Sequence, residues 1–250
     1  VIENAIEKYN LLSFDVVQLD SGLGFFRHSG FVQKMKMRGK KIICCYMGSD
    51  LRTRGVIPAI DRMADLNISV EFDHLNLHPN IKHVFFPFDV TRFQVQKRTG
   101  GKIRIGHAPT NRAAKGSDVI IPILDEIAQK YHVEVVLIEN MNYSDAIIAK
   151  QSCDIFIDQI GDLGYGINSL ESLAMGITTC SCLVPGFEER YQDHPFVVIN
   201  RENIKEKIIE LIENEEILSR KSEYGRKWVE QHHDSIKVVK QIHKLAGLSD

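Results

Sequence analysis

Residues 102–116 read KIRIGHAPTNRAAKG, and this stretch predicts a strand, a loop and the start of a helix in direct succession. The strand covers residues 102–106, and two cations, Arg112 and Lys115, follow it three positions apart, just ahead of Gly116. Cationic side chains beside the unpaired N–H groups and the positive dipole end of a helix form a place where a multiply charged anion can rest. The stretch therefore predicts a phosphate-binding turn at the end of a strand.

The same alternation of strand-like and helix-like segments continues along nearly the whole chain, which is the pattern of parallel sheets joined by crossover helices. The predicted strands are residues 14–20, 40–47, 68–72 and 83–90 in the first half, and 102–106, 133–139, 154–159, 177–184 and 196–199 in the second. The predicted helices are an opening helix, then 25–37, 56–66, 117–131, 144–151 and 167–175, and everything from residue 201 onward. The expected fold class is therefore α/β with parallel sheets.

A break in this alternation lies at VQKRTGGK (95–102), which has no periodicity and contains two adjacent glycines, as a linker would. We place the lobe boundary there, so that the first lobe is 1–97, the second is 98–231, and 232–250 is a C-terminal helix that packs back on the first lobe. The first lobe opens with a helix, whereas a doubly wound lobe normally opens with a strand whose following loop lines the cleft. We therefore expect the first lobe to be incomplete, with its first strand or two absent from this chain.

The composition limits the class of partner. The 250 residues include 31 basic and 33 acidic residues, a formal net charge of -2, so no whole-molecule field favours nucleic acid and no nucleic-acid partner is expected. Any basic site must be local.

Cysteine usage and hydropathy indicate a compartment. The five cysteines are an odd number without zinc-ligand spacing, which favours free thiols in a reducing, cytoplasmic setting over disulfides or a metal site. No apolar run approaches the length needed to span a bilayer. The run KMKMRGKK (34–41) leaves peripheral contact with an anionic membrane open beside the simpler interpretation of a solvated helix end.

The site is expected in loops that leave strands, because ligands of open parallel sheets bind beyond the carboxyl ends of the strands. Three loops qualify: MGSDLR (47–52), HAPTNRAAKG (107–116) and GDLGYGINSLE (161–171). In the third, two glycines flank Tyr165 just before a helix, so the backbone can approach a ligand closely and the helix N-terminus is free for an anion. Glu171 follows in the early turns of that helix, where its carboxylate is available to a sugar diol.

The second and third loops together resemble a known family. R-x-x-K-G at 112–116, then G-Y-G-x-x-x-x-E-x-x-A-x-G at 164–176 after a D-I-x-x-D strand, resembles the donor-binding domain of GT-B glycosyltransferases of the retaining, glycogen-synthase-like group. The likeness covers about residues 98–200, and MGSDLR resembles the H-G-S-D-x-R loop of the acceptor domain in that family.

The resemblance implies a GT-B-like fold of two Rossmann-like lobes. It also implies a nucleoside-diphosphate sugar as donor substrate and a glycan or lipid-linked molecule as acceptor, with no cofactor. Glycosyltransferases of the other common fold use an Asp-x-Asp metal site, and this chain contains no such triplet, so the resemblance implies metal-independent transfer.

The site residues carried over by the resemblance fall into three groups. Arg112 and Lys115 are the catalytic cations that neutralise the donor diphosphate. The loop over that diphosphate consists of Gly164, Tyr165, Gly166 and Ile167. The ribose contact is Glu171. The nucleobase meets the backbone from Glu139 to Met141, and His107 either contacts the diphosphate or packs beneath its loop.

Two positions depart from the pattern of the family. Met47 stands where the acceptor-side loop has His, and Leu163 stands where the E-x7-E pattern has its first acid. Both lie on the sugar-handling side, so a non-catalytic nucleotide-sugar-binding protein is the alternative to a transferase. A further alternative is a nucleotide-sugar 2-epimerase, which shares the architecture but needs acid and base carboxylates in its cleft.

Overall fold

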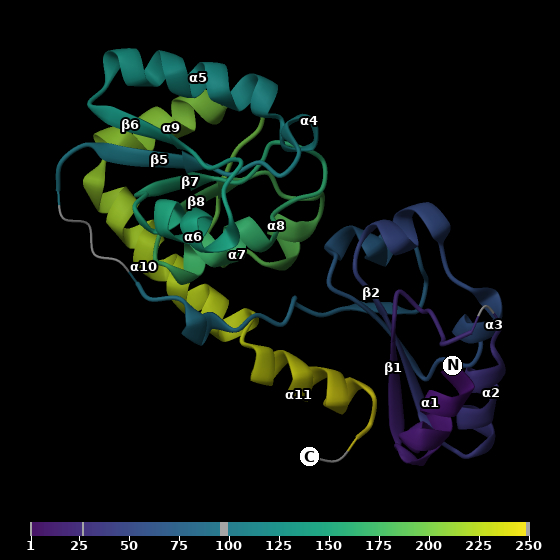
Figure 1. Ribbon diagram of the computed structural model, residues 1–250. Coiled ribbons are helices and arrows are strands. Elements are labelled where there is room, and N and C mark those ends of the chain that lie inside the picture. Colours follow the sequence, from purple (N-terminus) through teal and green to yellow (C-terminus); the bar gives the residue numbers. More distant parts are fainter. Residues whose placement is uncertain (1, 27, 96–99, 249–250) are drawn as a thin grey trace. The chain divides into compact units, whose positions relative to one another are not determined.

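The computed structural model describes residues 2–26, 28–95 and 100–248, and these form two compact units. One unit contains Val1–Pro87 together with Ser235–Asp250, and the other contains Phe88–Asp234 (Figure 1). The predicted lobe boundary after residue 97 and the middle of the predicted linker lie outside the described residues. The units are described separately below.

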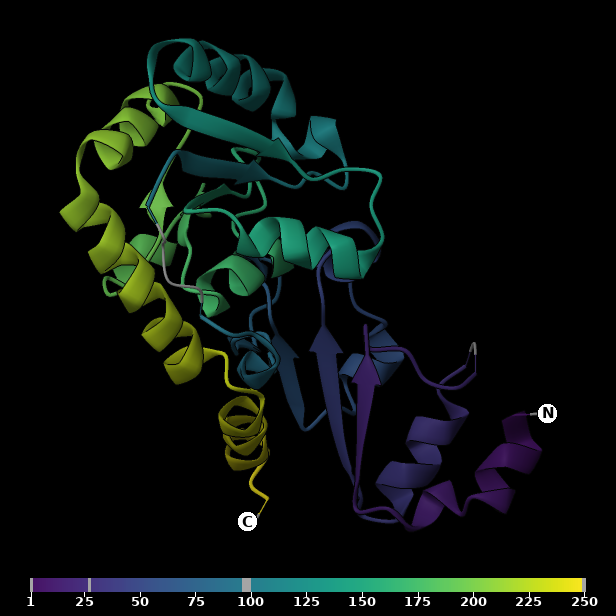
Figure 2. The same cartoon turned by 60° about the vertical axis from the view of Figure 1, so that its left-hand side comes forward.

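The first unit is built on a four-stranded parallel sheet in the order β1-β2-β3-β4. Its arrows, purple to blue in Figure 2, point the same way. The strands are β1 (Val16–Asp20), β2 (Lys41–Tyr46), β3 (Leu66–Ser69) and β4 (Ile81–His83), and the helices are α1 (Ile2–Lys8), α2 (Gly30–Met37), α3 (Pro58–Asp61) and α11 (Ser235–Leu245).

Strand β2 is buried and apolar from Ile42 to Tyr46, as expected for an inner parallel strand with both faces covered. Figure 1 shows α2 on one side of this sheet and α11 on the other. Phe31, Val32 and Met35 of α2 are buried against the sheet. At the far end, the Lys41 Nζ donates a hydrogen bond of 2.8 Å to the Ala246 carbonyl, which fastens the C-terminal segment to β2.

The second unit carries a five-stranded parallel sheet in the order β6-β5-β7-β8-β9. The strands are β5 (Ile103–His107), β6 (Val133–Leu137), β7 (Ile155–Ile157), β8 (Thr178–Ser181) and β9 (Val197–Val198). The helices are α4 (Arg112–Lys115), α5 (Ser117–Lys130), α6 (Tyr143–Gln151), α7 (Ile167–Ala174), α8 (Phe187–Arg190), α9 (Ile204–Glu213) and α10 (Glu215–His232). The chain runs from β5 to one side and returns to β7 on the other, so the strand order reverses between these two strands. Ligands of such sheets bind at this reversal, beyond the strand ends.

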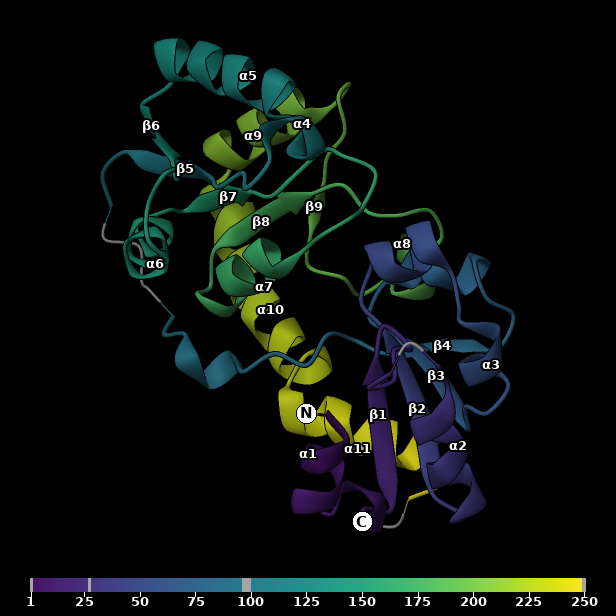
Figure 3. The same cartoon turned by 45° about the vertical axis from the view of Figure 1, so that its right-hand side comes forward.

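The sheet of the second unit lies between two helix layers. Figures 1 and 3 show α5 and α9 on one face, with α6, α7 and α10 on the other. Alternate residues of the central strands, such as Ile105 and Ile157, pack under α5 and α9 in one buried cluster. Gly106, the next residue after Ile105, packs closely against the segment between α6 and β7, because a Cβ there would lie 2.7 Å from the Cys153 Sγ.

Several predicted elements differ from the structure. The strand predicted at 83–90 is wrong, because the ladder of the four-stranded sheet ends at His83, and the buried residues that follow join no strand, with only an isolated bridge from Phe88 to Asp234. The predicted strand at 68–72 lies at Leu66–Ser69, and the helix predicted at 56–66 is only one turn, Pro58–Asp61. Apolar runs indicate burial, and burial does not require a strand.

The five cysteines all carry free thiols, and burial raises the pKa of Cys44 and Cys45 to about 12, so these two stay protonated. Within the described part of the chain, none of the helices combines the length and the apolar character that crossing a bilayer requires.

Pro122 lies inside α5, where it has no N–H to donate to the Asp118 carbonyl. The helix persists because Ile120, Leu124 and Ile127 are fully buried on its inner face, while Pro122 itself is exposed. An interior proline costs about 3 kcal/mol relative to alanine, and its restriction of the unfolded chain returns about 0.4–1 kcal/mol. We expect Pro122→Ala to raise the free energy of unfolding of this unit by about 1–3 kcal/mol in urea titrations.

The matched control is Gln129→Ala, an exposed position of the same helix, which should change that free energy by less than about 0.5 kcal/mol. A destabilised Pro122→Ala variant would show that the native helix depends on a proline bend at this turn.

Candidate functional site

The loops after β5 and β7 meet at the reversal of the strand order. The Ile160 N–H donates a hydrogen bond of 3.1 Å to the Lys115 carbonyl, which joins the two loops directly. Glycine is needed on both sides of this junction. A Cβ at Gly161 would lie 2.2 Å from the Ala114 carbonyl oxygen, and Gly116 has a φ of +73° with Ile160 packed against it.

Asp158 is the centre of this junction. Its side chain has no exposed area, and its Oδ1 lies 2.6 Å from the Lys115 Nζ. Its Oδ2 accepts hydrogen bonds from the Gly166 N–H at 2.9 Å and from the Ser169 hydroxyl at 2.7 Å. A buried carboxylate is stable only when it is paired and hydrogen-bonded in this way, so the two loops and the first turn of α7 are fixed by one anion.

Lys115 is thereby held at the start of α7. A Cβ built on Gly166, the N-cap of α7, would lie 3.9 Å from the Lys115 Nζ. The ammonium group therefore lies beside the N-terminus of this eight-residue helix.

Arg112, the other predicted cation, is exposed and forms a bidentate ion pair with Glu139 at the end of β6, with distances of 2.8 and 2.5 Å. This pairing raises the pKa of the Arg112 guanidinium and lowers the pKa of the Glu139 carboxyl. Lys115 and Arg112 thus point to different acids, one buried and one exposed.

A pocket of about 550 Å³ opens beside this pair, between the loops after β5 and β6 and the helices α6 and α7. Its apolar wall includes Ala108, Ile138, Met141 and Ile147, and its charged residues are Arg112, Glu139, Lys150 and Glu171. Asn140 has a φ of 55°, a left-handed conformation that turns the backbone at the pocket edge. The size and the mixture of apolar walls with a few polar groups are typical of small-molecule sites.

Glu171 lines this pocket but is not an exposed helix acid. It is 5% exposed, and it pairs with Lys150 of α6, which is 2% exposed. The Tyr143 hydroxyl donates to the other carboxylate oxygen at 3.0 Å. Lys150 and Tyr143 were not predicted from the sequence, since a lysine and a tyrosine in a short helix without a clear apolar face carry no signal of their own. Asp158 was not predicted either, although the D-I-x-x-D strand pointed to that position.

His107 is fully buried, and both of its ring nitrogens are occupied. They bond the Ile157 carbonyl at 2.9 Å and the Ser117 hydroxyl at 2.8 Å. Of the two alternatives left open by the sequence, this geometry favours packing beneath the loop over contact with a diphosphate. Burial lowers the pKa of His107, so the ring stays neutral.

The glycine-flanked loop is anchored by Tyr165. Its ring stacks on Phe196 with centroids 4.6 Å apart, and its hydroxyl lies 3.3 Å from the His233 Nε2. Gly164 has a φ of +72°, which a residue with a side chain rarely adopts. The tyrosine therefore holds the loop through its side chain, and the backbone before Ile167 is what a ligand would meet.

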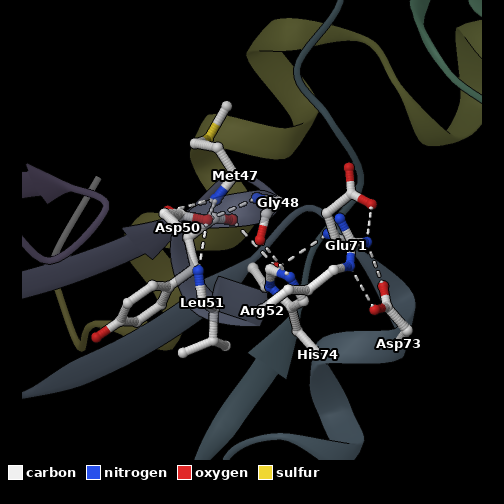
Figure 4. A network of polar contacts seen from close by, with 10 residues as sticks. Met47, Gly48, Asp50, Leu51, Arg52, Glu71, Asp73 and His74 are labelled. Carbon is white, nitrogen blue, oxygen red and sulfur yellow. Dashed lines mark hydrogen bonds and ion pairs between the residues drawn. The ribbon is translucent and has the colours of Figure 1, made fainter. Parts of the chain in front are cut away.

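The acceptor-side loop of the family resemblance lies in the first unit (Figure 4). The Asp50 carboxylate accepts from the backbone N–H groups of Met47, Gly48 and Leu51 at 2.8–3.2 Å. Burial raises the pKa of Asp50, but these donors outweigh burial and lower the pKa overall. Asp50 therefore closes a turn.

Arg52 and His74 complete this network (Figure 4). The Arg52 guanidinium pairs with Glu71 and Asp73, each at 2.6 Å, and the buried His74 bonds the Gly48 carbonyl at 3.0 Å. Met47 contributes its backbone N–H to this turn, its sulfur accepts a weak hydrogen bond of 3.6 Å from the Cys45 thiol, and the residue is 42% exposed. Leu163, the other departure from the family pattern, is 50% exposed in the second unit.

Solved structures of GT-B glycosyltransferases resemble the whole chain. HepE from Anabaena in complex with UDP has a TM-score of 0.67 and 12% identity, with 97% of this chain and 81% of that chain covered. Sucrose-phosphate synthase from Thermosynechococcus elongatus has a TM-score of 0.64 and 10% identity, with 98% and 75% covered. An alpha-glucosyltransferase in complex with UDP and a 13-mer DNA containing an HMU base has a TM-score of 0.62 and 12% identity, with 98% and 83% covered. No protein-family model and no curated protein matches the sequence. At these identities the likeness shows the fold, and it confirms the prediction of a GT-B-like α/β architecture.

Burial of His107 makes the stability of the folded chain depend on pH. In the unfolded chain His107 binds a proton below about pH 6.5, whereas the buried ring in the folded chain binds it only at lower pH. Acid therefore favours the unfolded state, and the stability due to the neutral ring is lost as the pH falls from about 6.5 toward the lowered pKa. We expect melting temperatures to decline between about pH 7 and about pH 5, and to decline less in His107→Asn.

His132→Asn is the control, because His132 is exposed on the same unit and its replacement should leave the decline unchanged. If His107→Asn and the parent lose the same number of degrees over this range, the buried ring does not titrate on unfolding.

Proposed function

We propose that the second unit binds a nucleoside-diphosphate sugar and that the protein transfers the sugar to a glycan or lipid-linked acceptor. One observation carries the proposal: the Lys115 ammonium lies beside the N-cap of α7, on the same edge of the sheet as Arg112 and the 550 Å³ pocket. The solved structures of HepE and of the alpha-glucosyltransferase are complexes with UDP, which supports a nucleotide donor.

The leaving group of such a reaction is a nucleoside diphosphate. As the bond to the sugar breaks, negative charge grows on the diphosphate, and fixed positive charge placed there lowers the barrier. Lys115 and the N–H groups at the start of α7 would stabilise this charge from one side. Arg112 would do so from the other after exchanging Glu139 for phosphate oxygens.

The nucleoside would occupy the pocket. Ala108, Ile138 and Ile147 offer apolar surface to a base, and the turned backbone around Asn140 and Met141 offers hydrogen-bonding groups at its edge. Glu171 would accept hydrogen bonds from the ribose hydroxyls, the role that the family resemblance assigns to it. Transfer with retention and without a metal ion follows from that resemblance and forms part of the proposal.

A non-catalytic nucleotide-sugar-binding protein is the second candidate, and the observation that favours it is the chemistry of Met47 and Leu163. Both side chains are largely exposed and neither can exchange a proton or hold a sugar hydroxyl. The phosphate-facing residues Arg112 and Lys115 retain their charges, so binding without turnover is consistent with the same site.

Binding is tested by replacing both cations. UDP or GDP should raise the melting temperature of the parent, and Arg112→Ala with Lys115→Ala should abolish this rise. A hydrogen bond to a charged group contributes about 1.5–3 kcal/mol, so the loss of two should raise the dissociation constant by about a hundredfold or more in calorimetric titrations.

Arg201→Ala is the matched control, since Arg201 is an exposed arginine of the same unit that pairs with Asp118 at 3.5 Å. Its affinity for the diphosphate should equal that of the parent. Equal thermal shifts in the double variant and the parent would show that the diphosphate binds elsewhere.

Turnover separates the two candidate functions. The protein incubated with a panel of nucleotide sugars, including UDP-glucose and GDP-mannose, should release nucleoside diphosphate above background from at least one donor. The double variant should release about a hundredfold less, because the growing charge on the leaving group loses both cations. Binding of a donor with release at the background rate would favour the non-catalytic candidate.

A further inference from the structure

Lys150 is the most deeply buried cation of the pocket. It lies near the end of α6, is 2% exposed, and sits 4.9 Å from the centre of the Phe156 ring. Its ammonium group donates to Glu171 and, at 2.6 Å, to the Asn168 Oδ1, so both of these partners come from α7. Nothing in the proposed chemistry of the diphosphate uses this lysine.

Stability alone does not explain why Lys150 and Glu171 form a buried ion pair. Removing two charges from water is unfavourable, and well-packed apolar residues of similar volume often stabilise a fold as much or more. What a buried pair does provide is a fixed geometry and a fixed charge on each partner. The pair of Lys150 and Glu171 therefore specifies where the carboxylate lies.

The other hydrogen bonds of Glu171 and Asn168 also fix the position of the Glu171 carboxylate. The Tyr143 hydroxyl donates to the Glu171 Oε1 while Lys150 donates to the Oε2, so each carboxylate oxygen is held from one side. A carboxylate has about four acceptor positions, so among the contacts of the described residues one on each oxygen is left for a ligand in the pocket. The Asn168 Nδ2 also donates to the Ala108 carbonyl at 3.0 Å, which ties the cluster to the loop that leads to Arg112.

We propose that Lys150 is a positioning residue that orients the Glu171 carboxylate toward the vicinal hydroxyls of a ribose, so that the pocket selects ribonucleotides over 2′-deoxyribonucleotides. The proposal rests on the proposed function, since it assigns a specificity to the nucleotide pocket of that function. Lys150 itself touches no ligand. It acts through Glu171, and its removal affects one hydroxyl contact and leaves the diphosphate contacts in place.

The test is calorimetric titration of the intact protein with UDP, GDP and ADP and with their 2′-deoxy counterparts. The parent should bind at least one ribonucleotide about tenfold or more tightly than its deoxy form, since a hydrogen bond to a charged group is lost. Lys150→Met should reduce this ratio to about threefold or less and change the affinity for the deoxy form little.

A double-mutant cycle shows whether Lys150 acts through Glu171. Glu171→Gln should reduce the ratio as Lys150→Met does, and the two changes together should reduce it no further, because coupled residues are non-additive. Lys130→Met is the matched control: Lys130 forms an exposed pair with Glu126 in the same unit, and its loss should leave the ratio unchanged.

Each outcome supports or overturns the proposal. If the parent binds none of the diphosphates, the proposed function and this inference both fail. If it binds them but Lys150→Met weakens ribose and deoxyribose forms equally, or adds to Glu171→Gln, Lys150 is structural only and the proposed function stands. Should Lys150→Met lack a cooperative melt, Lys150→Leu removes the donor with another apolar side chain, and an unchanged ratio in that variant overturns the inference.

Discussion

The donor-side site depends on the buried carboxylate of Asp158. This carboxylate has no exposed area and accepts from Lys115, from the backbone N–H of Gly166 and from Ser169, so its hydrogen bonds are satisfied only while all three elements remain in place. The loop after β5, the loop after β7 and the first turn of α7 are therefore fixed relative to one another by the requirement that this charge be satisfied. The glycines at 116 and 161 are the steric condition for the same junction, because a side chain at either position would hold the loops apart.

Each cation of the site is already paired with an acid, and the pairs differ in how readily they can exchange partners. The exposed pair of Arg112 and Glu139 contributes little stability, so a diphosphate can take the guanidinium at low cost. The buried pairs of Lys115 with Asp158 and Lys150 with Glu171 cannot be opened without leaving a charge unsatisfied. A ligand would therefore displace the exposed pair of Arg112 and Glu139, while the two buried pairs keep their positions.

The sequence predicted those features that depend on local spacing and missed those that depend on long-range contacts. The buried strand at 40–47 was predictable because both faces of Lys41–Tyr46 are covered, and the order of the elements was sufficient to predict the α/β fold. The partners of Arg112 and Lys115 lie 27 and 43 residues away in the chain, so the charge of the loop was visible from its sequence while its neutralisation was not. Apolar residues after His83 suggested a strand, because a sequence shows that a segment is buried and does not show whether it pairs.

The acceptor-side loop shows why chemistry can change in this fold without loss of structure. Asp50 closes the turn of residues 47–52 through backbone N–H groups, and neither the Arg52 nor the His74 contacts involve the side chain of residue 47, whose sulfur accepts from the Cys45 thiol outside the turn. Replacing the family's histidine by methionine therefore removes no hydrogen bond that holds this turn, and the exposed Met47 changes only what the loop presents to a ligand. Leu163 is likewise exposed. The loop around it is held by the backbone of Gly164 and by the side chain of Tyr165, and the side chain of Leu163 is not needed for it. At both positions the residue that would act on the sugar and the residues that maintain the fold are different, so activity and stability can vary independently.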